Sequence, residues 1–229
     1  MLSREQNVGR AAIRNFLASQ ASLTWLLFLD CDMDIISQRF LATYLDTEGD
    51  VIYGGYKVGP GEKSCLRYIY EKANEPQHTA SQRQTRPYQH FHTANFLIRR
   101  DILMEHPFDE QFTHYGYEDV LLGRRLREAS VPVSHIDNPA GFNTFEDNAS
   151  FVAKTEEGLR TLHEKRDLLR GYSRLITYAE GIHLNAARWL IRNGHRLLGP
   201  LERKLLCSKH PSLKVFKIYK LGYYLNIKA

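Results

Sequence analysis

Two aspartates lie two residues apart directly after a short apolar run. The run covers residues 24–29 and reads Thr-Trp-Leu-Leu-Phe-Leu, and Asp30 and Asp32 follow it. Carboxylates at i and i+2 beyond a buried strand can converge on one divalent cation, and oxygen ligands suit Mg²⁺ or Mn²⁺. Such an ion would keep some of its waters and would also bind a substrate phosphate. The alternative is a solvated turn, because aspartate is common in turns.

A second acidic pair, Glu118 and Asp119, opens an amphipathic stretch that runs to residue 129. Gly116 and Tyr117 come directly before the pair. Acidic side chains are favoured at the start of a helix by the helix dipole, so the pair can be read as a capping feature. A carboxylate held at a rigid helix start can also act as a general base that takes the proton of an incoming hydroxyl.

Two histidines, His90 and His92, lie ahead of Asn95 in the stretch His-Phe-His-Thr-Ala-Asn-Phe. On a strand, both imidazoles would lie on the same face, where they could bind a metal ion. No third candidate ligand is close to them in the sequence, so we expect a pocket wall. The small residues between His92 and Asn95 would let a ligand approach the backbone.

A third group lies near the start of the chain, where Asn7, Arg10 and Arg14 are spaced to share one helical face. Guanidinium groups there could hold a diphosphate or a ribose. The alternative is an ordinary solvated face of the helix.

The elements that position these residues alternate between helix and strand, which predicts an α/β sandwich. In such sheets ligands bind beyond the carboxyl ends of the strands, where the aspartates after residue 29 lie. Residues 74–89 contain two prolines and almost no aliphatic residues, and predict a mobile loop. The predicted strands cover residues 24–29, 50–56, 91–98 and 131–136, and the predicted helices cover 5–20, 36–46, 65–73, 100–105, 118–129, 151–178, 181–193 and 212–225, with a loop over 138–148.

The composition is that of a globular chain of one ordinary domain size. The chain has 229 residues, of which 43% are hydrophobic and 25% are charged. The longest apolar stretch, residues 25–29, is far too short to span a membrane, and the first ten residues do not form a secretory signal. Three widely spaced cysteines, Cys31, Cys65 and Cys207, predict neither a disulfide framework nor a zinc site, and favour reduced thiols in a cytoplasmic chain.

The net charge of +5 is unevenly distributed. Residues 1–158 hold 16 Lys and Arg against 22 Asp and Glu, and residues 159–229 hold 15 against 4. The basic part predicts either a surface that meets an anionic partner or a solvated helix face. Within it, residues 213–225 alternate apolar and aromatic side chains with lysines, as in a helix that lies on an anionic membrane surface or covers the core.

Taken in order, these pieces resemble a family 2 glycosyltransferase of the GT-A fold over about residues 7–162. Residues 7–15 resemble the helix that precedes the family's metal strand, and residues 26–32 (Leu-Leu-Phe-Leu-Asp-Cys-Asp) resemble that strand with its D-x-D motif. Residues 93–100 resemble the acceptor-side strand with the start of the helix after it. Residues 108–119, with Phe-Asp-Glu-Gln-Phe and Gly-Tyr-Glu-Asp, resemble the segment that carries the catalytic carboxylates.

The resemblance implies an α/β fold with a GT-A-like, Rossmann-like mixed sheet flanked by helices. It implies a glycosyltransferase domain over residues 1–158, followed by a basic, mostly helical extension over residues 159–229. Members of the family begin with a strand–helix–strand segment that holds the nucleotide base. Here Met1 stands almost at the following helix, which indicates a fragment, a misassigned start or a decayed copy.

The resemblance further implies transfer of a sugar from a nucleotide-sugar donor, UDP-linked, to an acceptor hydroxyl with inversion. Mn²⁺ or Mg²⁺ would bridge Asp30 or Asp32 to the diphosphate. Asp119, or in second place Glu118, would deprotonate the acceptor. Asn95 would line the donor-sugar pocket and Arg14 the nucleotide side. The residues implied in substrate binding are Arg14, Asn15, Asn95, Gly116 and Tyr117.

The acceptor implied by this reading is a saccharide or a lipid-linked sugar, as in polysaccharide or glycolipid synthesis. We expect no nucleic-acid partner, and the basic tail would allow peripheral contact with the inner face of the membrane. Many relatives complete the metal shell with a histidine after the strand that follows the Glu-Asp helix. Phe142 or a neighbour stands at that place here, and His135 lies upstream of the Pro139 turn.

Two other readings remain open. A haloacid-dehalogenase-type phosphohydrolase also places D-x-D after an apolar strand, with the first aspartate as nucleophile and the second as acid/base. Against it, Asp34 stands where that family has Thr or Val, and no Asp-Asp pair follows a later strand. The chain could instead be a non-enzyme, either an inactive remnant of a glycosyltransferase or a basic nucleic-acid-binding chain without a recognisable motif.

Overall fold

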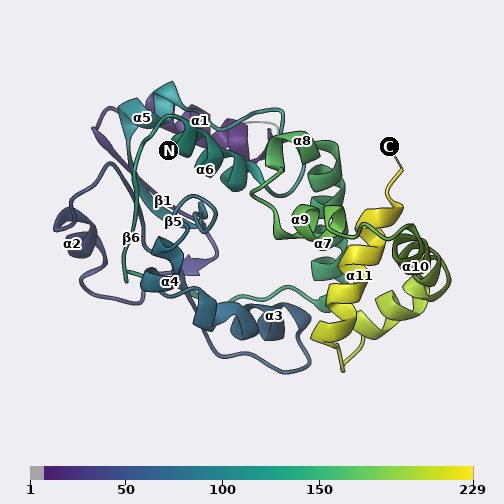
Figure 1. Cartoon of the computed structure of the whole chain (residues 1–229). Helices are drawn as coiled ribbons and strands as arrows, with labels where there is room; N and C mark the ends of the chain where they lie inside the picture. Colours follow the sequence, from purple (N-terminus) through teal and green to yellow (C-terminus); the bar gives the residue numbers. More distant parts are fainter. Residues whose placement is uncertain (1–7, 229) are drawn as a thin grey trace. The chain divides into compact units, whose positions relative to one another are not determined.

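The structure, a computed structural model, describes residues 8–228 and contains two compact units (Figure 1). The first is formed by the chain up to residue 56 and by residues 78–141. The second is formed by residues 57–77 and by the chain from residue 142 onward. These units are interleaved in the sequence, whereas the predicted domains meet at residues 158 and 159. That family-based division stays a prediction.

A four-stranded mixed sheet forms the centre of the first unit, so the predicted α/β class is confirmed. Its strands lie in the order β1, β5, β3, β6. Strand β5 runs antiparallel to both of its neighbours, and β3 pairs with β6 in parallel. The bounds are β1 Trp25–Leu29, β3 Val51–Tyr53, β5 Asn95–Arg99 and β6 Val133–His135.

Strand β1 departs from the expectation of a buried parallel strand. It is antiparallel to β5 and is the outer strand of this sheet within residues 8–228. Leu26 packs into the core, but Trp25 and Leu27 keep 40% and 37% of their surface exposed. The apolar run predicts that both faces of this strand are buried. Side chains alternate between the two faces of a strand, and only the face that carries Leu26 packs into the core.

The pairing of β1 with β5 fixes where the first acidic motif lies. Leu29 is opposite Asn95, and the backbone N–H of Asp30 continues the ladder by donating to the carbonyl of Ala94 over 2.9 Å. The aspartate turn therefore lies beside the segment that leads into β5. This register brings together two motifs that are more than 60 residues apart in the sequence.

Helices cover the sheet of the first unit. The core consists mainly of aromatic and branched side chains from the strands, with Ala11 and Ala18 of α1 and Leu122 and Leu126 of α6 packed against them. The small alanines let α1 approach the sheet closely. The helices of this unit are α1 Gly9–Gln20, α2 Phe40–Leu45, α4 Ala80–Gln84, α5 Arg100–Glu105 and α6 Glu118–Glu128.

The segment predicted as a loop over residues 74–89 contains short helical turns. They are the 3-10 helix η1 (Glu75–Gln77) and the helix α4. Thr79 is the N-cap residue of α4, and its side chain accepts a hydrogen bond from the N–H of Gln82. Arg83 of α4 is buried, and its guanidinium donates to the carbonyls of Gly54 and Ile136. The segment is polar, as the loop prediction assumes, but hydrogen bonds of Arg83 rather than apolar packing hold α4 in place.

Two further sequence expectations are corrected at strand ends. The strand predicted over residues 91–98 begins only at Asn95, so His90 and His92 lie in the preceding turn rather than on one strand face. The loop predicted over residues 138–148 contains the short strand β7. A second sheet has the order β2, β7, β4, with β2 Met33–Asp34, β4 Tyr56–Val58 and β7 Ala140–Phe142.

The second unit is helical. Its core is formed by Leu66, Phe151, Val152, Leu206, Phe216 and Tyr219. The helix predicted over residues 151–178 is divided, because the chain turns at Gly171 in a left-handed conformation with φ of 81°. The helices are α3 Leu66–Asn74, α7 Asn148–Glu164, α8 Arg166–Leu169, α9 Arg174–Glu180, α10 Asn185–Leu206 and α11 Leu213–Asn226.

Helix α10 is longer than the helix predicted over residues 181–193. It continues through Gly194 and Pro200, two residues that disfavour a helix interior, and ends at Leu206. Leu206 is fully buried in the core of the second unit, so tertiary packing overrides the local signals. Within residues 8–228, no helix is both long and apolar enough to cross a membrane. All three cysteines have free thiols.

Candidate functional site

Arg14 of α1 links two of the acidic motifs within the first unit. Its Nη2 lies 2.8 Å from Oδ1 of Asp30, and its Nη1 lies 3.2 Å from Oε1 of Glu118. Only 8% of the Arg14 side chain is exposed, compared with 31% for Asp30 and 5% for Glu118. Three residues that the sequence indicates separately therefore form one ion-pair network.

The aspartate motif lies on a tight turn at the end of β1. The N–H of Met33 donates to the carbonyl of Asp30 over 3.0 Å, which closes the turn. Asp32 is at the exposed side of this turn, whereas Asp30 faces Arg14. The turn thus places Asp30 in the network and leaves Asp32 exposed to solvent.

The two aspartates are a candidate ligand pair for a hard divalent cation that also binds a substrate phosphate. Within residues 8–228, no group of three or more His, Cys, Asp and Glu side chains could enclose a metal ion. Mg²⁺ is commonly bound by one or two carboxylates together with substrate phosphates, and Asp30 and Asp32 supply such a donor set. Arg14 contacts one oxygen of Asp30, and the other oxygen could share such an ion with Asp32.

A strained turn aims the second acidic pair. Gly116 and Tyr117 both have positive φ, of 97° and 72°, immediately before α6 begins at Glu118. Left-handed backbone costs a residue other than glycine about 1–2 kcal/mol, so Tyr117 is held there by its surroundings. The left-handed pair Gly116 and Tyr117 sets the orientation of the start of α6. Both carboxylates lie in the first helical turn, where the helix dipole stabilises negative charge.

Glu118 is the buried member of the pair. Burial raises its pKa, and the negative charge of Asp119 raises it further, while Arg14 and Arg10 act in the opposite direction. Arg10 is half-exposed and lies 3.9 Å from the Glu118 carboxylate. Its guanidinium also lies over the ring of Tyr115. Two arginines of the predicted α1 face thus meet Glu118, and Asn7, the third member, lies outside the described residues.

Asp119 is held by a histidine. Burial acts to raise its pKa, but a hydrogen bond and the charge of His92 hold its pKa below the ordinary value. Nδ1 of His92 lies 2.9 Å from one carboxylate oxygen of Asp119, and the N–H of Val120 donates to the other over 2.8 Å. Asp119 is therefore ionised at neutral pH and oriented through both oxygens.

His92 is a functional candidate that sequence reasoning missed, because it was interpreted as part of a pocket wall. A carboxylate bound to one ring nitrogen fixes the tautomer of an imidazole and stabilises its protonated form. A protonated His92 therefore keeps Asp119 ionised and in place. The ring of His78 stacks on it with 6.2 Å between centroids. The sequence signal was the His-x-His pattern, but its partner at residue 119 was not deducible from spacing.

Asn95 is fully buried and forms part of the scaffold. Its Oδ1 accepts a hydrogen bond from the hydroxyl of Tyr44 over 2.7 Å. Its Nδ2 donates to the carbonyls of Gly55 and Asn138 over 2.8 and 2.9 Å. The side chain thus ties β5 to the turn after β3. Its predicted role in binding the donor sugar stays a prediction, and it would require exchange of these bonds.

Asn15 has a positioning role in the structure. Its Nδ2 donates to the carbonyl of Phe108 and to Glu110, both over 2.9 Å, and its Oδ1 accepts from the N–H of Phe108 over 3.0 Å. The amide thereby holds the backbone that leads toward residues 116–119. A contact of Asn15 with a substrate stays a prediction.

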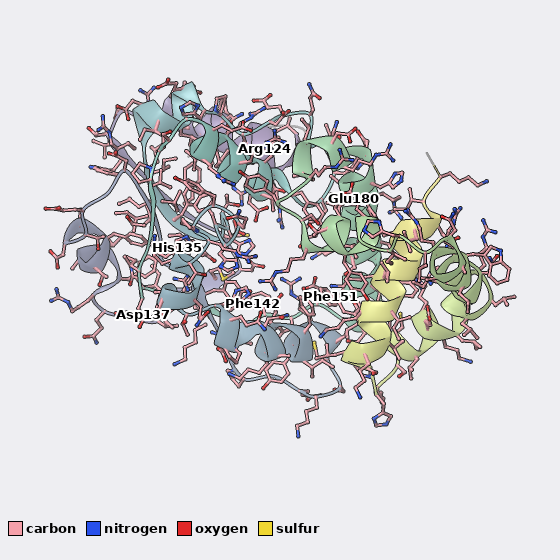
Figure 2. The ribbon with its side chains drawn as sticks, in the orientation of Figure 1. Arg124, His135, Asp137, Phe142, Phe151 and Glu180 are labelled. Atoms are coloured by element: carbon pink, nitrogen blue, oxygen red, sulfur yellow. The ribbon has the colours of Figure 1, made fainter. Side chains whose placement is uncertain are left out.

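A second buried pair, Arg83 and His135, was not indicated by the sequence. His135 is labelled in Figure 2. Nε of Arg83 donates to Nδ1 of His135 over 3.2 Å, and Nε2 of His135 donates to the carbonyl of Pro87 over 2.8 Å. Burial, followed by the nearby charge of Arg83, lowers the pKa of His135 to about 4. Both ring nitrogens are engaged, so His135 supports the fold.

Comparison with models of known protein families found no match to this chain. Comparison with curated proteins found no match either. The functional conclusion below therefore depends on the residues and their geometry.

Proposed function

We propose that this chain is a GT-A-like glycosyltransferase that moves a sugar from a nucleotide-sugar donor, UDP-linked, to an acceptor hydroxyl. The observation that carries the proposal is the ion-pair network of Arg14. It joins the turn after β1 to the start of α6, which are the two places where such an enzyme needs carboxylates. Asp119 and His92 lie directly beside this network on the same helix start and on the segment before β5.

The proposed reaction uses Asp119 as the proton acceptor. The acceptor hydroxyl loses its proton to the Asp119 carboxylate as its oxygen attacks the anomeric carbon in line. The bond from that carbon to the diphosphate oxygen breaks, the electron pair leaves with the nucleotide, and the configuration is inverted. His92 holds Asp119 in position.

The remaining residues position groups and balance charge. Mn²⁺ or Mg²⁺ held by Asp30 and Asp32 would stabilise the charge on the departing diphosphate. Arg14 can meet the same diphosphate if it releases Asp30, and its contact with Glu118 keeps the guanidinium aimed at the turn. The burial of Glu118 and its ion pair with Arg14 suit a positioning role better than that of the base.

Calorimetric titration of UDP into the chain, with and without Mn²⁺, tests this proposal. We expect binding that depends on the metal and is lost in Asp32→Ala. Asp34→Ala is the matched control, because Asp34 is a second exposed aspartate two residues farther along and should not matter. A folded chain that binds no UDP would overturn the proposal in favour of an inactive remnant. Metal-dependent phosphatase activity without UDP binding would favour the phosphohydrolase alternative.

A further inference from the structure

Helix α10 exposes a row of leucines on one face. Four of its five residues are spaced seven, four and four positions apart and so line up along the helix, and the fifth is adjacent to one of them. They keep between 41% and 79% of their surface exposed, although leucine is usually buried. We call this face the leucine stripe, and its members are Leu190, Leu197, Leu198, Leu201 and Leu205.

The opposite face of α10 is fixed to α11 within the second unit (Figure 1). The side chain of His195 lies against Gly222 of α11, where an added Cβ would come within 2.6 Å of it. Asn226 of α11 donates to the carbonyl of Arg192 over 3.1 Å and accepts from Arg196 over 3.1 Å. The leucine stripe is therefore held outward by contacts on the other side of the helix.

The surroundings of the stripe are strongly basic. Residues 185–228 contain ten Lys and Arg and one acidic residue, Glu202. Oε2 of Glu202 lies 3.0 Å from Nδ1 of His195, so the carboxylate of Glu202 faces the contact between α10 and α11. Arg188, Arg192 and Lys204 of the same helix are exposed. Trp189 is also exposed, at 65%.

This combination selects one kind of partner. A second copy would bring together two strongly basic segments, which opposes pairing through this helix. An exposed apolar row on a basic helix that also carries an exposed tryptophan is the pattern of a helix that lies in the plane of a bilayer surface. Anionic headgroups complement the charge, and the acyl boundary receives the leucines.

We propose that α10 docks the chain on an anionic lipid surface through the leucine stripe. The sequence pattern left residues 213–225 open between a helix on a membrane surface and a helix that covers the core. Phe216, Tyr219 and Tyr224 of that helix are buried, so α11 supplies lysines and anchors α10 while α10 makes the contact. The proposal goes beyond the transferase proposal and does not depend on it.

Co-sedimentation of the full chain with lipid vesicles tests this docking. We expect binding to vesicles of phosphatidylcholine mixed with phosphatidylglycerol, weakened by salt, and none to phosphatidylcholine alone. The double variant Leu197→Ser/Leu201→Ser should lower the affinity by about tenfold or more, from the lost apolar burial. The variant Leu45→Ser is the matched control, since Leu45 is 80% exposed but lies on α2 of the first unit.

Fluorescence gives a second readout that leaves the stripe intact. The chain has two tryptophans, so Trp25→Phe makes Trp189 the only one. Its emission should shift to the blue with anionic vesicles and stay unchanged with neutral ones. No sedimentation and no shift would overturn the proposal. Equal binding by the stripe variant would also overturn it, as would self-association that the stripe variant abolishes without any lipid binding.

Discussion

Nδ1 of His92 lies 2.9 Å from a carboxylate oxygen of Asp119, and this contact joins the segment before β5 to the first turn of α6. The carboxylate keeps its charge, because the hydrogen bond and charge of His92 outweigh the effect of burial on its pKa. The pair thus presents an ionised, oriented carboxylate beside the buried Glu118 and its arginine partner.

Replacing Asp119 by asparagine should stop transfer and spare donor binding. Asparagine keeps the size of the side chain and can still contact His92, but it cannot take a proton. We expect turnover to fall by about 10²–10⁴-fold, the usual contribution of a general base, with UDP affinity nearly unchanged. Initial-rate assays and calorimetry on the same preparation measure both quantities. Full turnover in this variant would show that Asp119 is not the base.

His92→Gln separates positioning from proton transfer. Glutamine can hydrogen-bond to Asp119 but does not titrate near neutral pH. If His92 only orients the carboxylate, turnover should fall less than tenfold and the pH profile should keep its shape. If His92 carries the proton away, the profile should lose one limb. A variant with unchanged rate and profile would remove His92 from the mechanism.

Removing Arg14 should destabilise the fold. Arg14→Ala leaves Glu118 buried without its closest cation, and breaking a buried ion pair costs about 3–5 kcal/mol. The loss should shrink at pH 5, because the raised pKa of Glu118 lets it take up a proton. Urea unfolding at pH 7.5 and pH 5 measures this.

The matched control for Arg14 is Arg10→Ala. Arg10 faces the same Glu118 carboxylate but is 53% exposed and 3.9 Å away, so its removal should cost less than about 1 kcal/mol. Adding Glu118→Gln to Arg14→Ala should recover part of the lost stability, since the buried charge is then gone. Equal losses from Arg10 and Arg14 would contradict the network described here.

Two glycines inside helices should respond oppositely to alanine. A Cβ on Gly123 of α6 would come within 2.4 Å of the Tyr88 carbonyl oxygen, a backbone atom that cannot easily move. Gly123→Ala should therefore destabilise by about 1–3 kcal/mol. Gly194 of α10 has no atom within 4 Å of such a Cβ. Gly194→Ala should stabilise by about 0.5–1 kcal/mol through helix propensity. Thermal unfolding of both variants checks the contrast.

The buried His135 predicts a loss of stability in mild acid. Its pKa in the folded chain is lowered to about 4 from an ordinary value of 6.5, so the unfolded chain takes up the proton first. The stabilisation is complete above about pH 6.5 and is lost as the pH falls toward 4, by about 2 kcal/mol at pH 5. Urea unfolding at a series of pH values measures the slope.

His135→Gln is the control for this slope, because an amide can replace both hydrogen bonds and does not titrate. This variant should be less stable at pH 7.5 but lose less stability on acidification than the unchanged chain. Parallel curves for the two proteins would show that His135 does not govern the acid response.

Local patterns predicted several elements closely. Helix α5 has the predicted bounds of residues 100–105, and α6 begins at the predicted Glu118. Both are short amphipathic segments whose ends carry acidic or proline signals, which act within a few residues. Strand β1 was also found in place, but its antiparallel, outer position was not predicted, because an apolar run does not encode its neighbours.

Long-range contacts account for the misses. The burial of Arg83 and the partner of His92 involve residues tens of positions apart, and no spacing rule connects them. The same holds for α10, which continues through Gly194 and Pro200 because Leu206 is buried against the other helices of its unit. A glycine in a helix interior costs about 1 kcal/mol relative to alanine, and the burial of one leucine side chain contributes more than that to stability.

The sequence by itself determined the α/β class, most of the helices and strands, and the acidic motifs that are candidates for chemistry. These follow from periodicity and residue type, which act locally. Only the tertiary structure decided that Arg14 joins Asp30 to Glu118, that His92 holds Asp119, and that α10 exposes a row of leucines. The physical reason is that pairing, burial and the resulting pKa values depend on which distant segments pack together.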